Sequence, residues 1–192
     1  MSLTAEDARY YLESAKTLTG PFRWNAVRKE EPQKRTEIQK ERPATAGRLD
    51  LLSQLAIGKA QPRNIRLRVS VFPRKPNVAT FQLECAMVPP RGNRIHVLYR
   101  LEWHPFSGHS NRFDLADGNL AGRYFENGET HEHICLDHVD DNGVVRAGDV
   151  HAARPLAVDP RDFNEALAYV CARLSITNCS EILPPEAQGE LL

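Results

Sequence analysis

Three consecutive segments in the middle of the chain alternate apolar and polar residues with a period of two. They run over residues 65–71, 81–87 and 95–103, and short turns at residues 73–77 and 89–93 separate them. A period of two is typical of a strand with one buried face, and connections this short join antiparallel neighbours. The pattern therefore predicts an antiparallel meander and argues against βαβ units.

A further hairpin is predicted at Asn127-Gly128, because Asn-Gly is the preferred pair for a two-residue type I′ turn. Residues 120–126 would then pair with residues 129–139. This register predicts three cross-strand pairs: Tyr124 with His131, Gly122 with His133, and Arg123 with Glu132 as an ion pair. The glycine would leave open space on the sheet beside the second histidine.

Helical patterns flank these strands. The first begins at Thr4, with Asp7 in the capping-box position, and its apolar face continues to Leu18. A short helix is predicted over residues 48–57, and a longer one follows the cap at Asp159-Pro160. The fold class predicted is α+β: an antiparallel β-sheet meander of about five to six strands flanked by N- and C-terminal helices.

The 192 residues are enough for one core, so we interpret residues 1–192 as a single α+β domain. Ten of the fifteen residues in 28–42 are charged, and residues 21–47 are therefore predicted to be a mobile segment after the N-terminal helix. No apolar run approaches the ~20 residues of a membrane span, and no signal segment is recognisable. We expect a cytoplasmic protein with no membrane partner. The scattered cysteines argue against a zinc knuckle or a disulfide scaffold.

The net charge of zero hides a strong asymmetry between the two halves of the chain. Residues 1–100 carry 19 Lys+Arg against 9 Asp+Glu, whereas residues 101–192 carry 6 against 16. Such polarity predicts either a basic surface for nucleic acid or two halves that neutralise each other.

Histidines are concentrated in the segment Thr130–Val139, where His131 and His133 lie beside Cys135 and Asp137. In an extended strand these four side chains would share one face. Two histidines at positions i and i+2 stand about 6.5–7 Å apart, which lets both reach one metal ion. The polar loop that follows Trp103 supplies a third candidate, His109.

Three interpretations of this concentration remain open. The histidines could bind a divalent ion, zinc or manganese, that activates water for phosphodiester or other hydrolysis. They could instead act without metal as general acid and base, with Arg100 or Arg123 stabilising an anion. They could also be structural strand residues. The candidate metal ligands are His131, His133, His109 and Asp137.

The order of these motifs resembles that of small uncharacterised bacterial proteins related to the TumE-type toxins of toxin–antitoxin pairs. A strand flanked by basic residues, 94–101, is followed by His109-Ser110-Asn111 and then by His131-Glu132-His133. The resemblance covers roughly residues 60–140. It implies that the histidines and the asparagine of the two motifs converge, and that the substrate is a nucleic acid or a nucleotide.

The leading hypothesis is a toxin-like nuclease or other phosphodiester-acting enzyme whose basic first half holds nucleic acid. In this hypothesis His131 and His133 bind a metal ion or transfer protons, and His109 completes this set of histidines. Asn111 positions the substrate, and Arg100 or Arg123 binds its phosphate. The alternative is a non-enzymatic binding module with structural histidines. In either case a partner or antitoxin protein is a candidate ligand.

Overall fold

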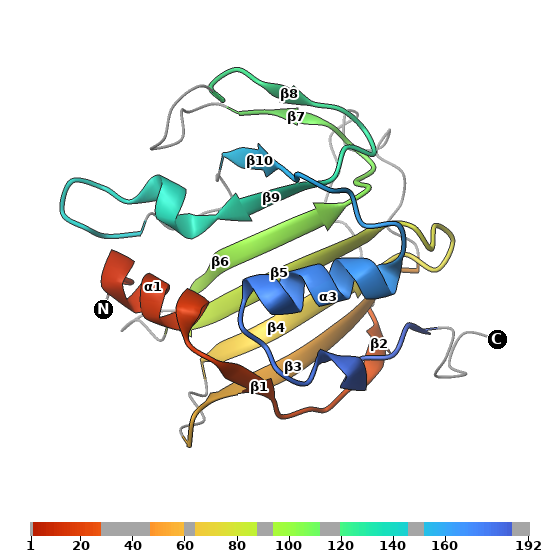
Figure 1. The fold of residues 1–192 in the computed structure, drawn as a ribbon, viewed down its shortest axis with the longest axis horizontal. Helices are drawn as coiled ribbons and strands as arrows, with labels where there is room; N and C mark the ends of the chain where they lie inside the picture. The colour runs from red at the N-terminus through yellow and green to blue at the C-terminus, as the bar shows by residue number, and fades with distance from the viewer. Residues whose placement is uncertain are drawn as a thin grey trace, which may run out of the picture.

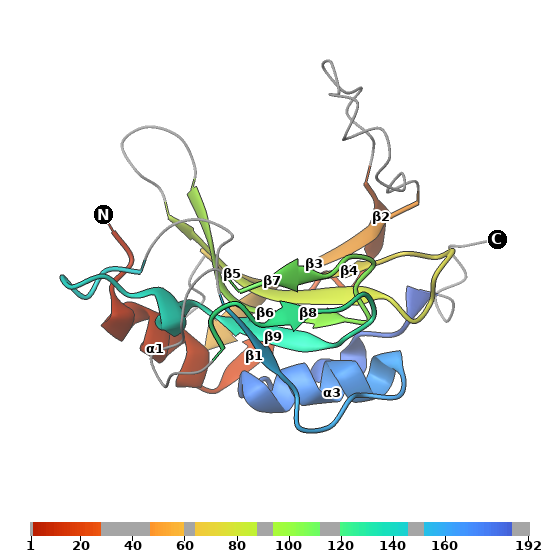
Figure 2. The same ribbon diagram turned by 90° about the horizontal axis from the view of Figure 1, so that it is seen from above.

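The computed structural model confirms an α+β protein built on one mostly antiparallel sheet (Figure 1). It describes residues 2–27, 47–59, 64–87, 94–111, 120–145 and 152–185. The main sheet has the strand order β1-β3-β4-β5-β6-β9-β10, and β2 pairs with β3 beside β1. Both α-helices of the described chain lie on the same face of this sheet (Figure 2).

The strands of the main sheet are β1 (Lys16–Leu18), β2 (Trp24–Ala26), β3 (Leu49–Ile57), β4 (Ile65–Val71), β5 (Ala79–Met87), β6 (Arg94–Trp103), β9 (His131–Ile134) and β10 (Ala153–Pro155). A separate pair consists of β7 (His109–Ser110) and β8 (Tyr124–Phe125). The helices are α1 (Ala5–Glu13) and α3 (Phe163–Arg173), with the short 3-10 helices η1 (Cys135–His138) and η2 (Cys179–Glu181).

The meander β4-β5-β6 predicted from the alternating pattern is confirmed. One set of alternating side chains is fully buried against the helices, because it forms the apolar side of the sheet. This core includes Leu67, Val69, Phe81, Leu83 and Leu101. The remaining side chains point to the opposite side, which we call the open face, since no helix of the described chain covers it (Figure 2).

The register places the polar residues of the open face in rows that cross the strands. One row contains Asp50, Ser70, Thr80, Glu102 and His131. The next row contains Arg68, Gln82, Arg100 and His133. The histidines of β9 therefore lie at one end of a polar surface that extends back across four strands.

Residues 48–57 were predicted to be helical, and this prediction is wrong. Leu49–Ile57 form the strand β3, which pairs with β4 on one side and with β1 and β2 on the other. The leucines of this segment fit both the helical period of 3.6 and the strand period of two. Pairing with neighbouring strands along both edges therefore decides in favour of a strand. The first helix also ends earlier than Leu18, at Glu13, because residues 16–18 join the sheet as β1.

Other predictions from the N-terminal half have mixed outcomes. Thr4 and Asp7 form the predicted capping box. Trp24–Ala26 lie within the segment predicted to be mobile, yet they form β2. The rest of that prediction, residues 28–46, lies outside the described residues. At the other end, Asp162 rather than Asp159 caps α3.

The predicted Asn127-Gly128 turn forms, but the hairpin does not. The Glu129 amide donates to the Glu126 carbonyl at 3.1 Å. The flanking segments then separate, because β8 pairs with β7 whereas β9 pairs with β6 and β10. None of the three predicted cross-strand pairs therefore exists, and Arg123 contacts Glu129 instead of Glu132.

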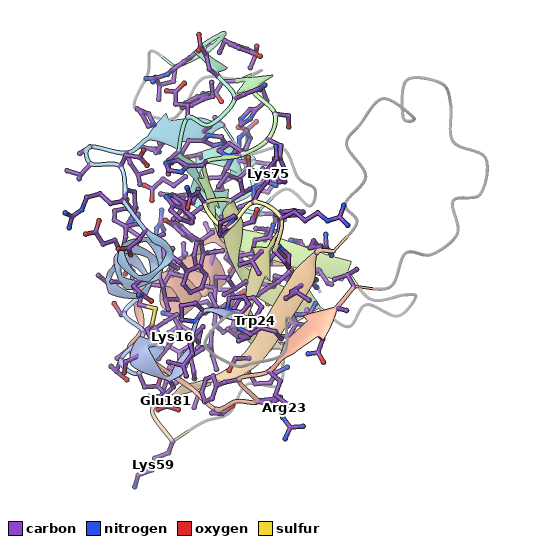
Figure 3. The ribbon with its side chains drawn as sticks, turned by 90° about the vertical axis from the view of Figure 1, so that its right-hand side faces the viewer. Lys16, Arg23, Trp24, Lys59, Lys75 and Glu181 are labelled. Atoms are coloured by element: carbon purple, nitrogen blue, oxygen red, sulfur yellow. A yellow bond between two sulfur atoms is a disulfide. The ribbon has the colours of Figure 1, made fainter. Side chains whose placement is uncertain are left out.

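A disulfide joins Cys171 at the end of α3 to Cys179 in η2, and its yellow bond is visible in Figure 3. Cysteine spacing alone did not predict this bond. Structural disulfides are typical of oxidising compartments. The disulfide does not support the predicted cytoplasmic location, which therefore stays a prediction.

Neither helix in the described part of the chain has the length and apolar character needed to cross a bilayer.

The two neighbouring leucines of β3 test the fold directly. Leu51 is fully buried, whereas Leu52 points to the open face and is 37% exposed. We expect Leu51→Ala to lower the free energy of unfolding by about 2–5 kcal/mol through lost burial and a residual cavity. Leu52→Ala should cost about 1 kcal/mol or less. Urea denaturation measures both, and equal losses would contradict the assigned faces of β3.

Candidate metal centre

Strand β9 brings two histidines into the sheet. His131 lies opposite Glu102 of β6, and His133 lies opposite Arg100. Both imidazoles are buried, at 0% and 1% exposure. Between them, Glu132 points to the helical side, where Tyr99 and Tyr169 hydroxyls donate to its carboxylate at 2.9 and 3.1 Å. The alternation of the strand thus separates the histidines from the core.

A side-chain clasp delivers the third histidine from β7. The Asn111 amide donates to the Ala153 carbonyl at 2.9 Å and accepts from the Ala153 amide at 2.7 Å. Ala153 of β10 lies directly opposite His133. The clasp therefore holds β7 over the edge of the sheet, two residues from His109. The His109 ring centroid lies 4.7 Å from that of His131 and 5.3 Å from that of His133.

Gly108 allows this approach. A Cβ atom at this position would lie 2.2 Å from the Phe125 carbonyl oxygen and 2.7 Å from the Tyr124 hydroxyl. Any side chain here would push β7 away from β8. The position before the third histidine therefore requires glycine because two backbones approach closely.

The three histidines form a group of potential metal ligands. One ring nitrogen from each of His109, His131 and His133 lies within 4.8 Å of the other two. Nitrogens around a tetrahedral zinc ion stand about 3.4 Å apart, given Zn–N distances of about 2.0–2.1 Å. Small rotations of the rings would close this difference. Three imidazoles leave the fourth position of such an ion free for water, as in catalytic sites.

Within the described structure, the buried Nε2 of His109 has no hydrogen-bond partner. A buried polar atom without a partner costs free energy, so the group is suited to a ligand. Burial lowers the pKa of His109, and the nearby His131 contributes in the same direction. The ring is therefore neutral at neutral pH, and its lone pair is available to a cation.

Both ring nitrogens of His131 have partners. Its Nδ1 lies 2.7 Å from the Glu129 carbonyl oxygen and donates a hydrogen bond to it. Its Nε2 faces Glu102 Oε2 at 3.1 Å. Burial raises the pKa of Glu102, but the hydrogen bond from His131 and the Arg100 charge outweigh this effect and lower it to about 2. A metal ion bound at Nε2 would take the place of the proton in this hydrogen bond.

Arg100 of β6 contacts both His133 and Glu102. Its Nη2 lies 3.3 Å from His133 Nε2, and its Nε lies 3.2 Å from Glu102 Oε1. The guanidinium thus occupies the Nε2 lone pair of His133. Binding of an ion through this nitrogen would displace the guanidinium and free its donors for an anionic ligand.

The structure brings together His109, His131, His133 and Arg100, but not the other predicted site residues. Asp137 accepts two hydrogen bonds from Arg154, at 3.0 and 2.6 Å, because β9 ends before it and η1 turns it away. Arg123 stacks on the Phe125 ring at 4.6 Å. Asn111 is buried and bonded to backbone, so it holds β7 rather than contacting a substrate.

Sequence reasoning missed Glu102 as part of the site. It alternates with Arg100 on the polar side of a strand that ends beside His104, so a pair of opposite charges at a strand end was the available signal. Its partner in β9 comes from a non-local pairing that no local pattern specifies. Cys135, by contrast, is buried, and burial raises the pKa of its thiol to about 12. A thiol of this kind is a poor metal ligand.

No family model, curated protein or solved structure matches this chain. The interpretation of the site therefore depends on the geometry of the three histidines and on the motifs of the sequence.

The metal-binding capacity of the cluster can be tested with matched histidine variants. We expect the purified protein to bind about one zinc ion, and His109→Ala to weaken binding at least about tenfold by removing one ligand. His104 hydrogen-bonds Asp159 outside the cluster, so His104→Ala should bind zinc as the wild type does. Isothermal titration with zinc measures both variants. Equal affinities would remove the cluster as the site.

The clasp can be tested separately from the ligands. Asn111→Ala leaves the amide and carbonyl of Ala153 without partners, so we expect a loss of about 1–3 kcal/mol in unfolding free energy. Zinc affinity should fall about tenfold because His109 is no longer fixed. Asn164 is exposed on α3, and Asn164→Ala serves as control. Unchanged zinc affinity in a folded Asn111→Ala protein would show that the clasp does not position the ligand.

Proposed function

We propose that the protein is a metal-dependent enzyme that hydrolyses phosphodiester bonds, a toxin-like nuclease in its substrate class. The observation that carries this proposal is the convergence of His109, His131 and His133 beside the guanidinium of Arg100. Histidine ligands with an open position and an adjacent cation are the components that hydrolysis of an anionic ester requires.

The side chains of the site would have distinct roles. His109, His131 and His133 would hold the ion, and a set of imidazoles favours zinc over manganese. When bound, such an ion lowers the pKa of a coordinated water to about 7 and so supplies a nucleophile. Arg100 would bind a phosphate oxygen through its two terminal nitrogens. The ionised Glu102 would accept a hydrogen bond from water in the site and orient it.

Two features of the sequence support the same substrate class. The H-x-N and H-x-H motifs that resemble those of TumE-type toxins are the motifs that contribute all three histidines. The excess of basic residues in the first half suits a polyanionic substrate. An antitoxin protein as partner and a cytoplasmic location belong to this proposal.

A binding module is the second candidate, and one observation favours it. Both nitrogens of His131 have partners, and Arg100 already contacts His133 Nε2. These two histidines could therefore be structural residues at a buried sheet edge. A stable complex with a partner protein that survives replacement of the histidines would favour this candidate.

Cleavage of single-stranded RNA with zinc or manganese tests the enzymatic proposal. We expect wild-type protein to cleave RNA, chelator to stop cleavage, and added metal to restore it. The double variant His131→Ala/His133→Ala should lose at least about 10²-fold activity because the ion has no site. The double variant, purified identically, controls for contaminating nuclease, and His104→Ala controls for replacement of a histidine outside the cluster. Activity that survives in the double variant, or absence of activity in metal-loaded wild type, would contradict the proposal.

A further inference from the structure

A groove on the open face leads to the candidate metal centre. It has a volume of about 390 Å³, and Arg100 and Glu102 line its end. These two residues contact His133 and His131 respectively. Arg100 and Glu102 therefore connect the groove with the buried His131 and His133.

The lining residues Arg48, Arg68 and Glu84 belong to a network of ion pairs that also includes Asp50 and Arg66. Asp50 accepts from Arg48 at 3.0 Å and from Arg68 at 2.8 Å. Glu84 accepts from Arg66 at 2.6 Å and from Arg68 at 2.7 Å. Three arginines thus contact these two carboxylates, and Arg68 is shared between them.

The two signs of charge differ in exposure. The carboxylate side chains of Asp50 and Glu84 are 8% and 5% exposed, whereas those of Arg48, Arg66 and Arg68 are 34%, 23% and 21% exposed. With Arg100 and Glu102, four arginines surround three carboxylates. Around Asp50 and Glu84 a ligand would therefore meet guanidinium donors rather than carboxylate oxygens, which suits an anion. Beside Arg100 the two signs are about equally exposed, at 16% for Arg100 and 20% for Glu102.

Apolar side chains line the groove beside these donors. Phe72, Ile95 and Val97 belong to its lining, and Ile95 is 46% exposed. Phe72 is fixed by an edge-to-face contact with Phe106 at 4.7 Å. Guanidinium donors beside an aromatic and aliphatic surface are the combination that binds a backbone phosphate and an unstacked base.

We propose that this groove binds a single-stranded segment of nucleic acid, with phosphates on Arg68 and Arg100 and bases against Phe72 and Ile95. This inference rests on the proposed function and names the conformation of its substrate. The side chains of Arg68 and Arg100 are only 21% and 16% exposed, so the donors lie below the rim. Phosphates on a rigid duplex cannot enter a recess of this volume, whereas a flexible single strand can.

Fluorescence anisotropy of labelled oligonucleotides with the full-length protein tests this proposal in the presence of EDTA, so that cleavage does not consume the probe. RNA of about eight nucleotides, DNA of the same sequence and the corresponding duplex serve as probes. We expect the single strands to bind at least about tenfold more tightly than the duplex. A preference for RNA over DNA would show that the 2′-hydroxyl is read, and equal affinities would show that it is not.

Charge-matched variants locate the binding surface. Gln82 lies between Arg68 and Arg100 in one row, so Gln82→Glu places a negative charge on the floor without removing an ion pair. We expect it to weaken single-strand binding about tenfold and to reduce the slope of log affinity against log salt by about 0.7 for one lost phosphate contact. Asn164→Asp, the same change on α3, should bind within about twofold of wild type.

A second variant guards against loss of folding in Gln82→Glu. Ile95 is exposed, so Ile95→Glu should fold and should also weaken binding. Equal affinity of the groove variants and Asn164→Asp, a duplex that binds as tightly as the single strand, or no binding by wild type would overturn the proposal. Binding without cleavage after metal loading would retain the groove and remove the proposed enzyme. Cleavage that neither Gln82→Glu nor Ile95→Glu affects would retain the proposed enzyme and remove the groove as its binding surface.

Discussion

The pairing of β9 with β6 is the interaction on which the candidate site depends. It sets His131 beside Glu102 and His133 beside Arg100 on the open face. A shift of one residue would exchange the faces and place Glu132 in the site. Hydroxyl donors from Tyr99 and Tyr169 oppose such a shift, because they hold the Glu132 carboxylate on the helical side. The contacts of Glu132 on the core side of β9 thus fix His131 and His133 on the open face.

The third histidine reaches the site through backbone contacts rather than through a strand of the main sheet. Asn111 binds both polar groups of Ala153, and Gly108 permits β7 to lie against β8. Two of the three histidines therefore lie on a strand of the main sheet, and the clasp fixes β7, the strand that carries the third. Rigid placement of ligands lowers the entropic cost of binding an ion. The clasp also fixes the strand that carries His109 Nε2, a buried ring nitrogen without a hydrogen-bond partner in the described structure.

Local patterns were sufficient for the elements whose neighbours in sequence are also their neighbours in space. The alternation over residues 65–103 predicted β4, β5 and β6, and the i, i+2 spacing correctly placed His131 and His133 on one face. The wrong predictions concern segments whose structure is decided by pairing with strands that are distant in sequence. The Asn127-Gly128 turn is present, but no local signal shows that β9 leaves β8 to pair with β6. The same limitation hid Glu102 and wrongly extended the strand to Asp137.

The same sheet explains why a polar groove and a histidine cluster occur together. Alternation along the strands gives one apolar face, which the helices cover, and one polar face that no helix of the described residues covers (Figure 2). Because the strands are in register, polar residues distant in sequence align in rows that end at β9. Substrate binding and catalysis, as proposed, would use adjacent parts of a single surface.

The most direct test of the account is the ¹⁵N NMR spectrum of the imidazole nitrogens before and after addition of about one equivalent of zinc. We predict that the ligating nitrogens of His109, His131 and His133 shift together, while His104 and His138 keep their resonances. His131 should bind through Nε2, because its Nδ1 donates to the Glu129 carbonyl. Zinc-dependent shifts at other histidines, or none at these three, would contradict the convergence on which the proposed function depends.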